Sequence, residues 1–437
     1  MRYRRGVVMG SLVAVGVLLA ACTGQVATDG PAASSGEGLA PSASATKVLP
    51  PGGPSSPGLA GSTSAAASAG IQPAFAATLE PLLAAKIAQL GTPGAAVSVT
   101  IPGKGTWTKS FGVSDRATGT PMSAENHTRI GSVTKTMTAA VVLQLVDEGL
   151  VKLDEPIATY LQGVPNGEMI TVRQLLNMTS GLANTTESDA FNQSLDADTT
   201  KTFSVREVLQ YAFDEPPLFA PGAQFYYTNT NYDLLGELAE KVTGVGLPEL
   251  FTTRLFQPLG MTESSLPALD DNSLPQPFTH GYNYGTNVQA NDALKAVLAG
   301  NTAGAQVTVP AGTEPRDSTN DTASYAWASG AAISTLGDLA IWATELGTGT
   351  LLDPKTQQGR LDFSKQDYGL GVRQAAGGWV GHNGATPGYQ TWVGYQPKTG
   401  ATVIVVANMQ LAPNVFLGDG LPADSLAQII TENLATG

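Results

Sequence analysis

Hydrophobic residues change their spacing along this chain, and the changes predict where it folds. From 75 to 90 the apolar side chains recur with the period of an amphipathic helix. Two β-rich runs, 95–101 and 106–112, flank a Pro-Gly-Lys-Gly turn and are typical of a hairpin. A second hairpin is predicted at 389–408, where a turn containing Pro and Gly separates two runs of the same kind.

Between these hairpins the pattern is mostly helical. Residues 134–147 are apolar nearly all round, which predicts a buried central helix capped by Gly149. A last helix is predicted from Ser425, because Ser425 and Gln428 have the form of a capping box. Sheet elements at both ends and helices between them predict an α+β fold with a cleft between the two parts.

Two polar stretches interrupt the helical middle, at 184–202 and 287–320. Because polar residues dominate both stretches, we expect loops over or beside the cleft. Such loops would shape specificity, because segments held over a rigid scaffold commonly carry recognition residues.

The first 72 residues lack the pattern of a packed domain. Arginines precede an apolar run at 6–21, which is typical of a secretory signal peptide at 1–21. The following Leu-Ala-Ala-Cys sequence resembles a bacterial lipoprotein box, which implies cleavage before Cys22 and a lipid on its thiol; an uncleaved anchor with an incidental cysteine is the alternative. Residues 22–72, rich in Ala, Ser, Gly and Pro, are expected to form a disordered tether.

Residues 73–437 would then be a single folded domain outside the cell, lipid-anchored to the outer face of the bacterial cell membrane. The 437-residue chain is 42% hydrophobic, enough for a sizeable core. Its 23 Lys and Arg against 36 Asp and Glu give a net charge of −13, which argues against nucleic acid as a partner. One cysteine and three dispersed histidines cannot make a typical zinc site, and we expect no metal and no cofactor.

The candidate chemistry begins at the start of the buried central helix, with Ser132-Val133-Thr134-Lys135. Helical residues three apart share a face, so the Lys135 amine can reach the Ser132 hydroxyl and act as its base. The positive end of the helix dipole should also lower the pKa of Lys135. The alternative is a helix cap and a solvated lysine. A second Ser-x-x-Lys, starting at Ser44, lies in the low-complexity stretch and is interpreted as chance.

Two further segments carry polar groups suited to acyl transfer. The run 225–232 places Tyr227 and Asn229 between a turn and a helix start. Tyr227 could relay protons, its phenolate favoured by a nearby lysine ammonium, and Asn229 could donate to a substrate carbonyl. The alternative is an aromatic core cluster with Asn229 as a helix cap. The second segment is Gly381 to Ala385, predicted as a strand beside the C-terminal hairpin, whose backbone could supply an oxyanion donor.

In this order and spacing the motifs resemble those of the serine β-lactamase/DD-peptidase superfamily. The flanking blocks 129–135, 170–182 and 330–340 look like the branch of class C β-lactamases, D-alanyl-D-alanine carboxypeptidases and related esterases. The resemblance extends from about Phe75 to the C-terminus. It implies a β-lactamase/transpeptidase-like fold: an antiparallel sheet flanked by helices, a mostly helical part, and an active site in the cleft between them.

The resemblance also implies residue roles. Ser132 would be the acylated nucleophile, Lys135 its base, and Tyr227 the relay that also activates the deacylating water; His382 stands where many relatives place a lysine. The substrate-binding positions would be Asn229, Asn383, Gly384 and Ala385, with the backbone N–H groups of Ser132 and Ala385 as the oxyanion hole. Because a histidine is mostly neutral near pH 7, carboxylate recognition is in doubt. Lys398-Thr399-Gly400 spells the usual third motif, but it falls in a hairpin turn and is rejected.

The implied function is a cell-envelope serine hydrolase that forms an ester on Ser132, like a D-alanyl-D-alanine carboxypeptidase or a β-lactamase. Its partners would be a peptidoglycan peptide, a β-lactam or an ester, and the membrane through the lipid anchor. Two alternatives stay open: an esterase acting on small or lipid esters with the same residues, and a penicillin- or wall-peptide-binding protein that does not turn over.

Overall fold

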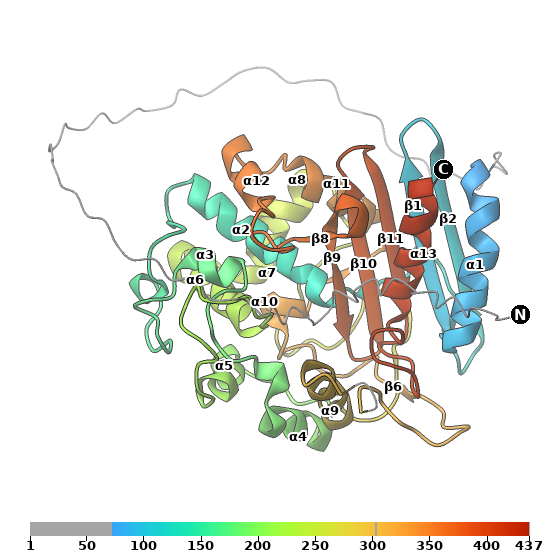
Figure 1. The fold of residues 1–437 in the computed structure, drawn as a ribbon, viewed down its shortest axis with the longest axis horizontal. Coiled ribbons are helices and arrows are strands. Elements are labelled where there is room, and N and C mark those ends of the chain that lie inside the picture. Colours follow the sequence, from blue (N-terminus) through green and yellow to red (C-terminus); the bar gives the residue numbers. More distant parts are fainter. Residues whose placement is uncertain (1–71, 302–303, 437) are drawn as a thin grey trace, which may run out of the picture. The chain divides into compact units, whose positions relative to one another are not determined.

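A seven-stranded antiparallel sheet forms the centre of the domain (Figure 1). The computed structural model describes residues 72–301 and 304–436, so the predicted signal peptide, Cys22 and nearly all of the predicted tether lie outside the described residues. In spatial order the strands are β3 (Thr120–Pro121), β2 (Gly105–Asp115), β1 (Gly94–Ile101), β11 (Ala401–Ala407), β10 (Tyr389–Gln396), β9 (Trp379–Thr386) and β8 (Arg373–Ala375).

Both predicted hairpins are confirmed, and they join in one sheet. Strand β1 pairs with β2 and β10 with β11, while β1 also pairs with β11, which brings the two ends of the domain side by side. Strand β9 lies next to β10, with His382 opposite Val393. The Lys398-Thr399-Gly400 sequence lies in the turn between β10 and β11, as predicted.

Helices cover both faces of the sheet. The first and last helices, α1 (Ala74–Leu90) and α13 (Pro422–Thr436), lie on one face (Figure 1). Val403 and Val405 of β11 point into this layer, whereas Ile404 and Val406 point into the opposite core. Successive strand residues alternate between faces, so a strand covered on both sides must be apolar throughout. The unbroken apolar run of β11 follows from this double burial.

Helix α13 begins three residues earlier than the sequence indicated. Its first residue is Pro422, and the Ser425 amide donates to the Leu421 carbonyl, so Ser425 lies inside the helix and the predicted capping box is wrong. Proline fits the first turn because its missing N–H has no partner there in any case.

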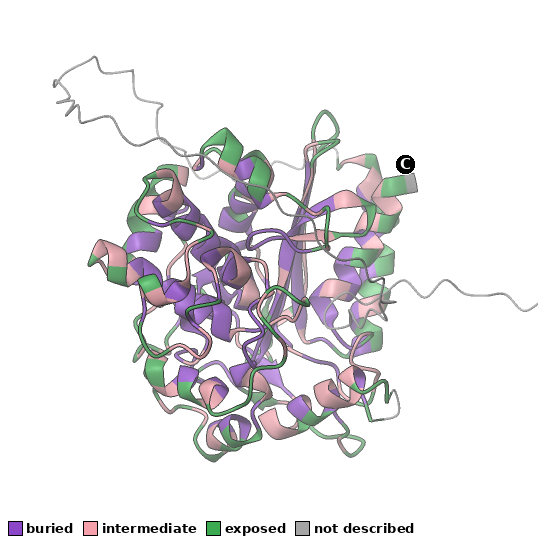
Figure 2. Cartoon of the chain, turned by 60° about the vertical axis from the view of Figure 1, so that its left-hand side comes forward, coloured by how far each residue is buried: buried purple, intermediate pink, exposed green. Residues whose placement is uncertain are grey.

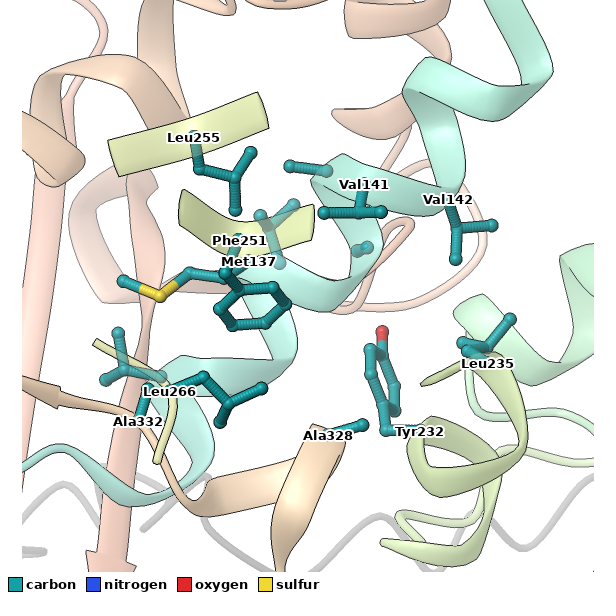
Figure 3. Close-up of a cluster of buried hydrophobic side chains, with 14 of the residues drawn as sticks. Met137, Val141, Val142, Tyr232, Leu235, Phe251, Leu255, Leu266, Ala328 and Ala332 are labelled. Atoms are coloured by element: carbon teal, nitrogen blue, oxygen red, sulfur yellow. The ribbon is translucent and has the colours of Figure 1, made fainter. Parts of the chain in front are cut away.

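The predicted central helix is α2 (Thr134–Asp147), with the bounds expected, and Gly149 follows it at a φ of 74°. Met137, Val141 and Val142 of α2 lie among Phe251, Leu255 and other apolar residues of the largest core cluster (Figure 3). Burial on all sides fixes the start of α2, and therefore Ser132 and Lys135, against the sheet.

The rest of the domain is mostly helical (Figure 1). The longer helices are α4 (Asp189–Ala197), α5 (Val205–Phe213), α6 (Thr230–Thr243), α9 (Asn287–Leu298) and α11 (Leu336–Thr348). The shorter helical elements are η1 (Gly131–Val133), η2 (Ile157–Thr159), α3 (Val172–Leu176), η3 (Thr185–Glu187), α7 (Leu247–Phe251), η4 (Thr252–Phe256), α8 (Gln257–Leu259), α10 (Trp327–Gly330), α12 (Pro354–Arg360) and η5 (Ala376–Gly378). Two small sheets pair β4 (Thr128–Arg129) with β7 (Ile333–Ser334), and β5 (Tyr282–Asn283) with β6 (Arg316–Asp317).

The prediction of loops is wrong for 189–197 and 287–298, which are helical, and holds for most of the described residues of 299–320. The first polar stretch contains α4 and the second contains α9, and the two helices pack against each other. The Ser188 hydroxyl accepts from the Phe191 amide at the start of α4, and Thr286 forms a complete capping box at the start of α9. Side-chain caps satisfy the free N–H groups of a helix start, so polar residues here begin helices.

Buried residues concentrate in the sheet and in the helix faces turned toward it, while exposed residues lie on the outer turns (Figure 2). Among the residues that the structure describes, no helix has the length and apolar content needed to span a membrane.

Candidate active site

Ser132 and Lys135 meet at the start of α2. Ser132 lies in the η1 turn, and the Lys135 Nζ is 3.0 Å from the Ser132 Oγ. Ser132 does not cap the helix, because the N-cap position of α2 is Val133 and it makes no side-chain cap. Lys135 is fully buried rather than solvated. The geometry therefore excludes both alternatives, the helix cap at Ser132 and the solvated side chain of Lys135.

The contacts of Lys135 determine how its amine can act. Its Nζ donates to the Asn229 Oδ1 at 2.5 Å and to the Ser329 carbonyl oxygen at 2.7 Å. Both partners are acceptors only, so they use two N–H groups of the amine. A neutral amine has two N–H groups and one lone pair, and the third contact, to the Ser132 Oγ, is left for the lone pair. The arrangement positions neutral Lys135 to accept the hydroxyl proton of Ser132.

Burial lowers the pKa of Lys135 from 10.5 to about 7, because the charged form loses its hydration. The Asp233 carboxyl acts in the opposite direction and raises this pKa. The predicted lowering is confirmed, but its main cause is desolvation rather than the helix dipole. A lysine with a pKa near 7 is neutral often enough to serve as a base.

Asn229 precedes α6, yet its side chain does not cap that helix. Its Oδ1 accepts from Lys135, and its Nδ2 donates to the Thr186 Oγ1 at 2.9 Å. The Asn229 backbone amide donates to the Asn184 Oδ1 at 3.1 Å. These contacts exclude the cap interpretation and hold Asn229 next to the Ser132–Lys135 pair. Sequence reasoning missed Asn184 and Thr186, which lie in the first polar stretch.

Tyr227 lies beside the same pair, with its ring centre 5.0 Å from the Lys135 Nζ. Burial raises the pKa of Tyr227, and a hydrogen bond with Ser132 and the charge of Arg373 act only partly against it. The predicted stabilisation of a phenolate by Lys135 is therefore wrong: the amine faces the ring, and a desolvated phenol keeps its proton. Tyr227 is placed to donate a proton to a group at Ser132, not to start as the base.

His382 completes the cluster from strand β9. Its ring lies 6.0 Å from the Tyr227 ring between centres, and its Nε2 is 3.2 Å from the Tyr368 hydroxyl. Burial lowers the pKa of His382 well below 6.5, and the positive charges of Arg373 and Lys135 lower it further. The imidazole is neutral, so it does not replace the cation that a lysine would supply.

Asn383 points away from this cluster, which corrects its predicted role in binding substrate. Neighbouring residues of a strand face opposite sides, so His382 and Asn383 cannot both face Ser132. The Asn383 Nδ2 donates to the Asp424 carboxylate of α13 at 3.2 Å. Burial raises the pKa of Asp424 to about 6, with the Asn383 hydrogen bond and Arg373 acting against the shift. The pair ties β9 to α13 behind the site.

Two glycines let strand β9 lie directly against the Ser132 turn. A Cβ atom on Gly384 would come within 2.0 Å of the Ile130 carbonyl oxygen and 2.9 Å of the Ser132 nitrogen. A Cβ atom on Gly131, which has a φ of 51°, would come within 2.6 Å of the Ala385 nitrogen. Only glycine allows this approach, and it brings the amide nitrogens of Ser132 and Ala385 to one place. These are the two amides predicted for an oxyanion hole; Gly131 was missed.

A cavity of about 260 Å³ opens at Ser132. Asn229 and Ala385 line it beside the hydroxyl, and α4, α9 and residues 410–421 form its far walls. Tyr227, His382 and Asn383 do not line it. Both predicted polar stretches border this cavity, although as helices rather than loops.

The state of Lys135 predicts how reactivity depends on pH. The rate constant for modification of Ser132 by a fluorophosphonate should rise with pH, with a midpoint near 7, because only the neutral amine accepts the hydroxyl proton. Burial raises the pKa of Asp233 well above 3.8, and the charge of Lys135 acts against this shift. In Asp233→Asn the midpoint should move to lower pH, since the carboxylate that raises the Lys135 pKa is gone. Glu240→Gln, on the same helix and with the same charge change, is the control. An unmoved midpoint in Asp233→Asn would exclude this coupling.

Comparison with known proteins gives the family. The model of the family described as Beta-lactamase matches residues 75–421. Protein flp of Staphylococcus aureus (strain N315) is 25% identical over 331 residues, which cover 72% of this chain and 60% of the relative. The chain thus spans about 60% of the length of the first curated relatives it matches. D-aminopeptidase of Brucella anthropi is 35% identical over 177 residues, 40% of this chain and 33% of the relative.

Solved structures agree in fold. The D-stereospecific amidohydrolase from Streptomyces sp. has a TM-score of 0.66 at 27% identity, covering 82% of this chain and 97% of that chain. The D-amino acid amidase from Ochrobactrum anthropi SV3 complexed with L-phenylalanine has a TM-score of 0.68 at 25% identity, covering 82% and 98%. The family model covers most of the chain and the solved structures share its fold, so the chain belongs to the beta-lactamase family of serine hydrolases.

Proposed function

We propose that this protein is an exported serine acyl hydrolase that cleaves an ester or amide through an ester on Ser132. One observation carries the proposal: a buried amine with a pKa of about 7 lies 3.0 Å from the Ser132 Oγ, with its other two contacts fixed by acceptors. A free serine hydroxyl is a weak nucleophile near neutral pH, and such a base is what makes it reactive.

In the acylation step, neutral Lys135 takes the proton of the Ser132 hydroxyl as the Oγ attacks the substrate carbonyl carbon. The carbonyl oxygen becomes negative and lies between the Ser132 and Ala385 amides, where fixed N–H donors stabilise it. The C–O or C–N bond to the leaving group then breaks. The leaving group takes a proton from Tyr227, and Lys135 returns its proton to the phenol.

Deacylation runs through the same groups in reverse. A water molecule takes the place of the leaving group, and its oxygen attacks the ester carbonyl carbon. The proton of this water passes to Tyr227, and the phenol passes a proton on to neutral Lys135. The tetrahedral species collapses, the Ser132 Oγ regains a proton from Lys135, and the acid leaves. Neutral His382 packs against the Tyr227 and Tyr368 rings and holds the phenol in place.

The relatives bear on the bond that is cleaved. Their names include a D-aminopeptidase, a D-stereospecific amidohydrolase and a D-amino acid amidase, which favours amides as well as esters for this chain. A carboxypeptidase or β-lactamase reaction needs a substrate carboxylate to be bound. The neutral state of His382 and the engagement of Asn383 with Asp424 favour the esterase and amidase alternatives over it.

Intact mass measured over time tests the proposal. The domain is incubated separately with a fluorophosphonate, with a penicillin and with a p-nitrophenyl ester, and adducts are mapped to peptides. We expect a stable phosphonyl adduct on Ser132, a short-lived acyl adduct from the ester, and little adduct from the penicillin. An ester or penicillin adduct that persists would indicate a binding protein without turnover. No adduct from any of the three reagents would refute the proposal.

We also propose that the protein is held at the outer face of the cell membrane by a lipid on Cys22. The sequence before Cys22 and the charged and apolar segments preceding it support this placement. Cys22→Ser is expected to move the protein from the membrane fraction to the soluble fraction and to abolish incorporation of a labelled fatty acid. Retention of the label in Cys22→Ser would exclude this anchor.

A further inference from the structure

The cavity at Ser132 is walled mostly by apolar side chains. Helix α4 contributes Phe191 and Leu195, and helix α9 contributes Leu294 and Val297. The segment after the last strand closes the cavity with Leu411, Phe416, Leu417 and Leu421. Since apolar surface favours apolar ligands, these walls define what can fill the cavity.

No side chain among the described residues that line the cavity is charged. Arg373, whose charge acts on Tyr227 and His382, does not line the cavity. Two other cations near the cavity are engaged elsewhere. Lys135 is held by Asn229 and Ser329, and Lys295 of α9 forms an ion pair with Asp189 of α4 at 2.6 Å. A substrate carboxylate placed here would lose its hydration without meeting a positive charge in the lining.

Two of the polar lining residues, Asn192 and Asn291, do not compensate. The Asn291 Nδ2 donates to the Glu187 carbonyl and the Asp189 carboxylate, and the Asn192 Nδ2 donates to two backbone carbonyls of the same segment. The Oδ1 of Asn291 is buried without a partner, and an acceptor repels an anion. These amides hold α4 and α9 together and offer no site for a negative group.

The position of Tyr227 decides which part of the substrate enters the cavity. A leaving group must lie at its proton donor, and Tyr227 does not line the cavity. The leaving group therefore projects toward Tyr227, and the acyl group, on the other side of the carbonyl carbon, enters the cavity between α4 and α9.

From these contacts we propose that the cavity selects an uncharged, largely apolar acyl chain, and that α9 sets this selectivity through Leu294. The inference rests on the proposed function, because it assumes acyl transfer to Ser132. It narrows that function to hydrolysis of esters or amides whose acyl chain is neutral where it enters the cavity, and it excludes acids with a carboxylate or an ammonium at the far end of that chain.

A panel of three p-nitrophenyl esters of equal length tests the proposal: the hexanoate, the adipate monoester with a terminal carboxylate, and the 6-aminohexanoate. We expect kcat/KM, corrected for the hydroxide rate of each ester, to be at least about 30-fold higher for the hexanoate than for either charged ester. From acetate to hexanoate, kcat/KM should rise about three- to fourfold for each added methylene. Equal values across the three esters, or a preference for a charged one, would overturn the proposal.

A matched pair of variants assigns the effect to the cavity wall. Leu294→Lys places a cation in the cavity and should raise kcat/KM for the adipate monoester at least about tenfold while lowering it for the hexanoate. Leu298→Lys adds the same charge one turn further along α9, at a half-buried position outside the lining, and should keep the wild-type preference. An equal change in both variants would show a general charge effect and refute the role of Leu294.

Labelling separates this proposal from the function on which it rests. If the fluorophosphonate labels Ser132 while the adipate monoester is hydrolysed at least as well as the hexanoate, only the cavity proposal fails. If Ser132 is not labelled and no ester is hydrolysed, the proposed function fails, and the cavity proposal fails with it.

Discussion

Ser132→Ala is expected to lower kcat/KM for any ester substrate by at least about 10⁴-fold and to change the free energy of unfolding by no more than about 1 kcal/mol. Without the Oγ no acyl-enzyme forms, and only the two backbone amides remain to stabilise an oxyanion. The stability effect is small because the hydroxyl is only half-buried. The Lys135 amine keeps both of its other acceptors when the hydroxyl is removed.

The chain provides a control for this substitution. Ser44 begins a second Ser-x-x-Lys sequence in the low-complexity stretch, so Ser44→Ala removes the same group from the same four-residue motif. Ser44→Ala should match the wild type in kcat/KM and in fluorophosphonate labelling. Activity of Ser132→Ala above about one per cent of wild type, still blocked by the fluorophosphonate, would place the nucleophile elsewhere.

The strands and the central helix were predictable because their patterns are strong and local. Residues 134–147 are apolar all round, and each hairpin consists of two β-rich runs around a short turn. Pairing of β1 with β11 joins residues about three hundred positions apart, and no local pattern contains that contact.

The helices at the cavity were missed for a different reason. Polar residues outnumber apolar ones along α4, but Ser188 and Thr286 mark the starts of α4 and α9 by their capping bonds. Capping patterns therefore indicated helices where the overall polarity indicated loops.

Errors at the site have two sources. Alternation along a strand already implied that His382 and Asn383 face opposite sides, so the correct role of Asn383 was available from the sequence. Asp233 lies four residues after Asn229 and so shares its helix face, which was a usable signal for a group near Lys135. Burial, in contrast, depends on the whole fold. It sets the pKa of Lys135, Tyr227 and His382, and no local rule could give the phenol its raised pKa.

Removing the base should separate activity from stability. Lys135→Met is expected to lower kcat/KM by about 10⁴-fold or more, since no other group near Ser132 can take its proton at neutral pH. The melting temperature at pH 6 should nevertheless equal or exceed that of the wild type. A shift of the Lys135 pKa from 10.5 to about 7 means that burying its charged form costs about 4 to 5 kcal/mol. Methionine has a similar length and no charge.

Lys135→Met also loses stability, which opposes the gain from removing the buried charge. The Asn229 Oδ1 and the Ser329 carbonyl lose their donor, at about 1 to 3 kcal/mol each. The pH dependence separates the two effects. Below pH 7 Lys135 is protonated in both the folded and the unfolded chain. The full free energy of burying its charge then lowers the stability of the wild type. Between about 7 and 10.5 the unfolded chain binds more protons, so wild-type stability rises with pH and the cost disappears. The melting temperature of Lys135→Met relative to wild type should therefore fall steadily from pH 6 to pH 9.5.

Lys241→Met is the control, because it removes the same charge from an exposed position on α6. It should leave both kcat/KM and the pH trend of the melting temperature unchanged. A difference between Lys135→Met and wild type that stays constant from pH 6 to pH 9.5 would mean that Lys135 keeps an ordinary pKa in the folded protein. The amine would then be protonated at neutral pH, and the lone pair that the mechanism assigns to the Ser132 proton would not exist.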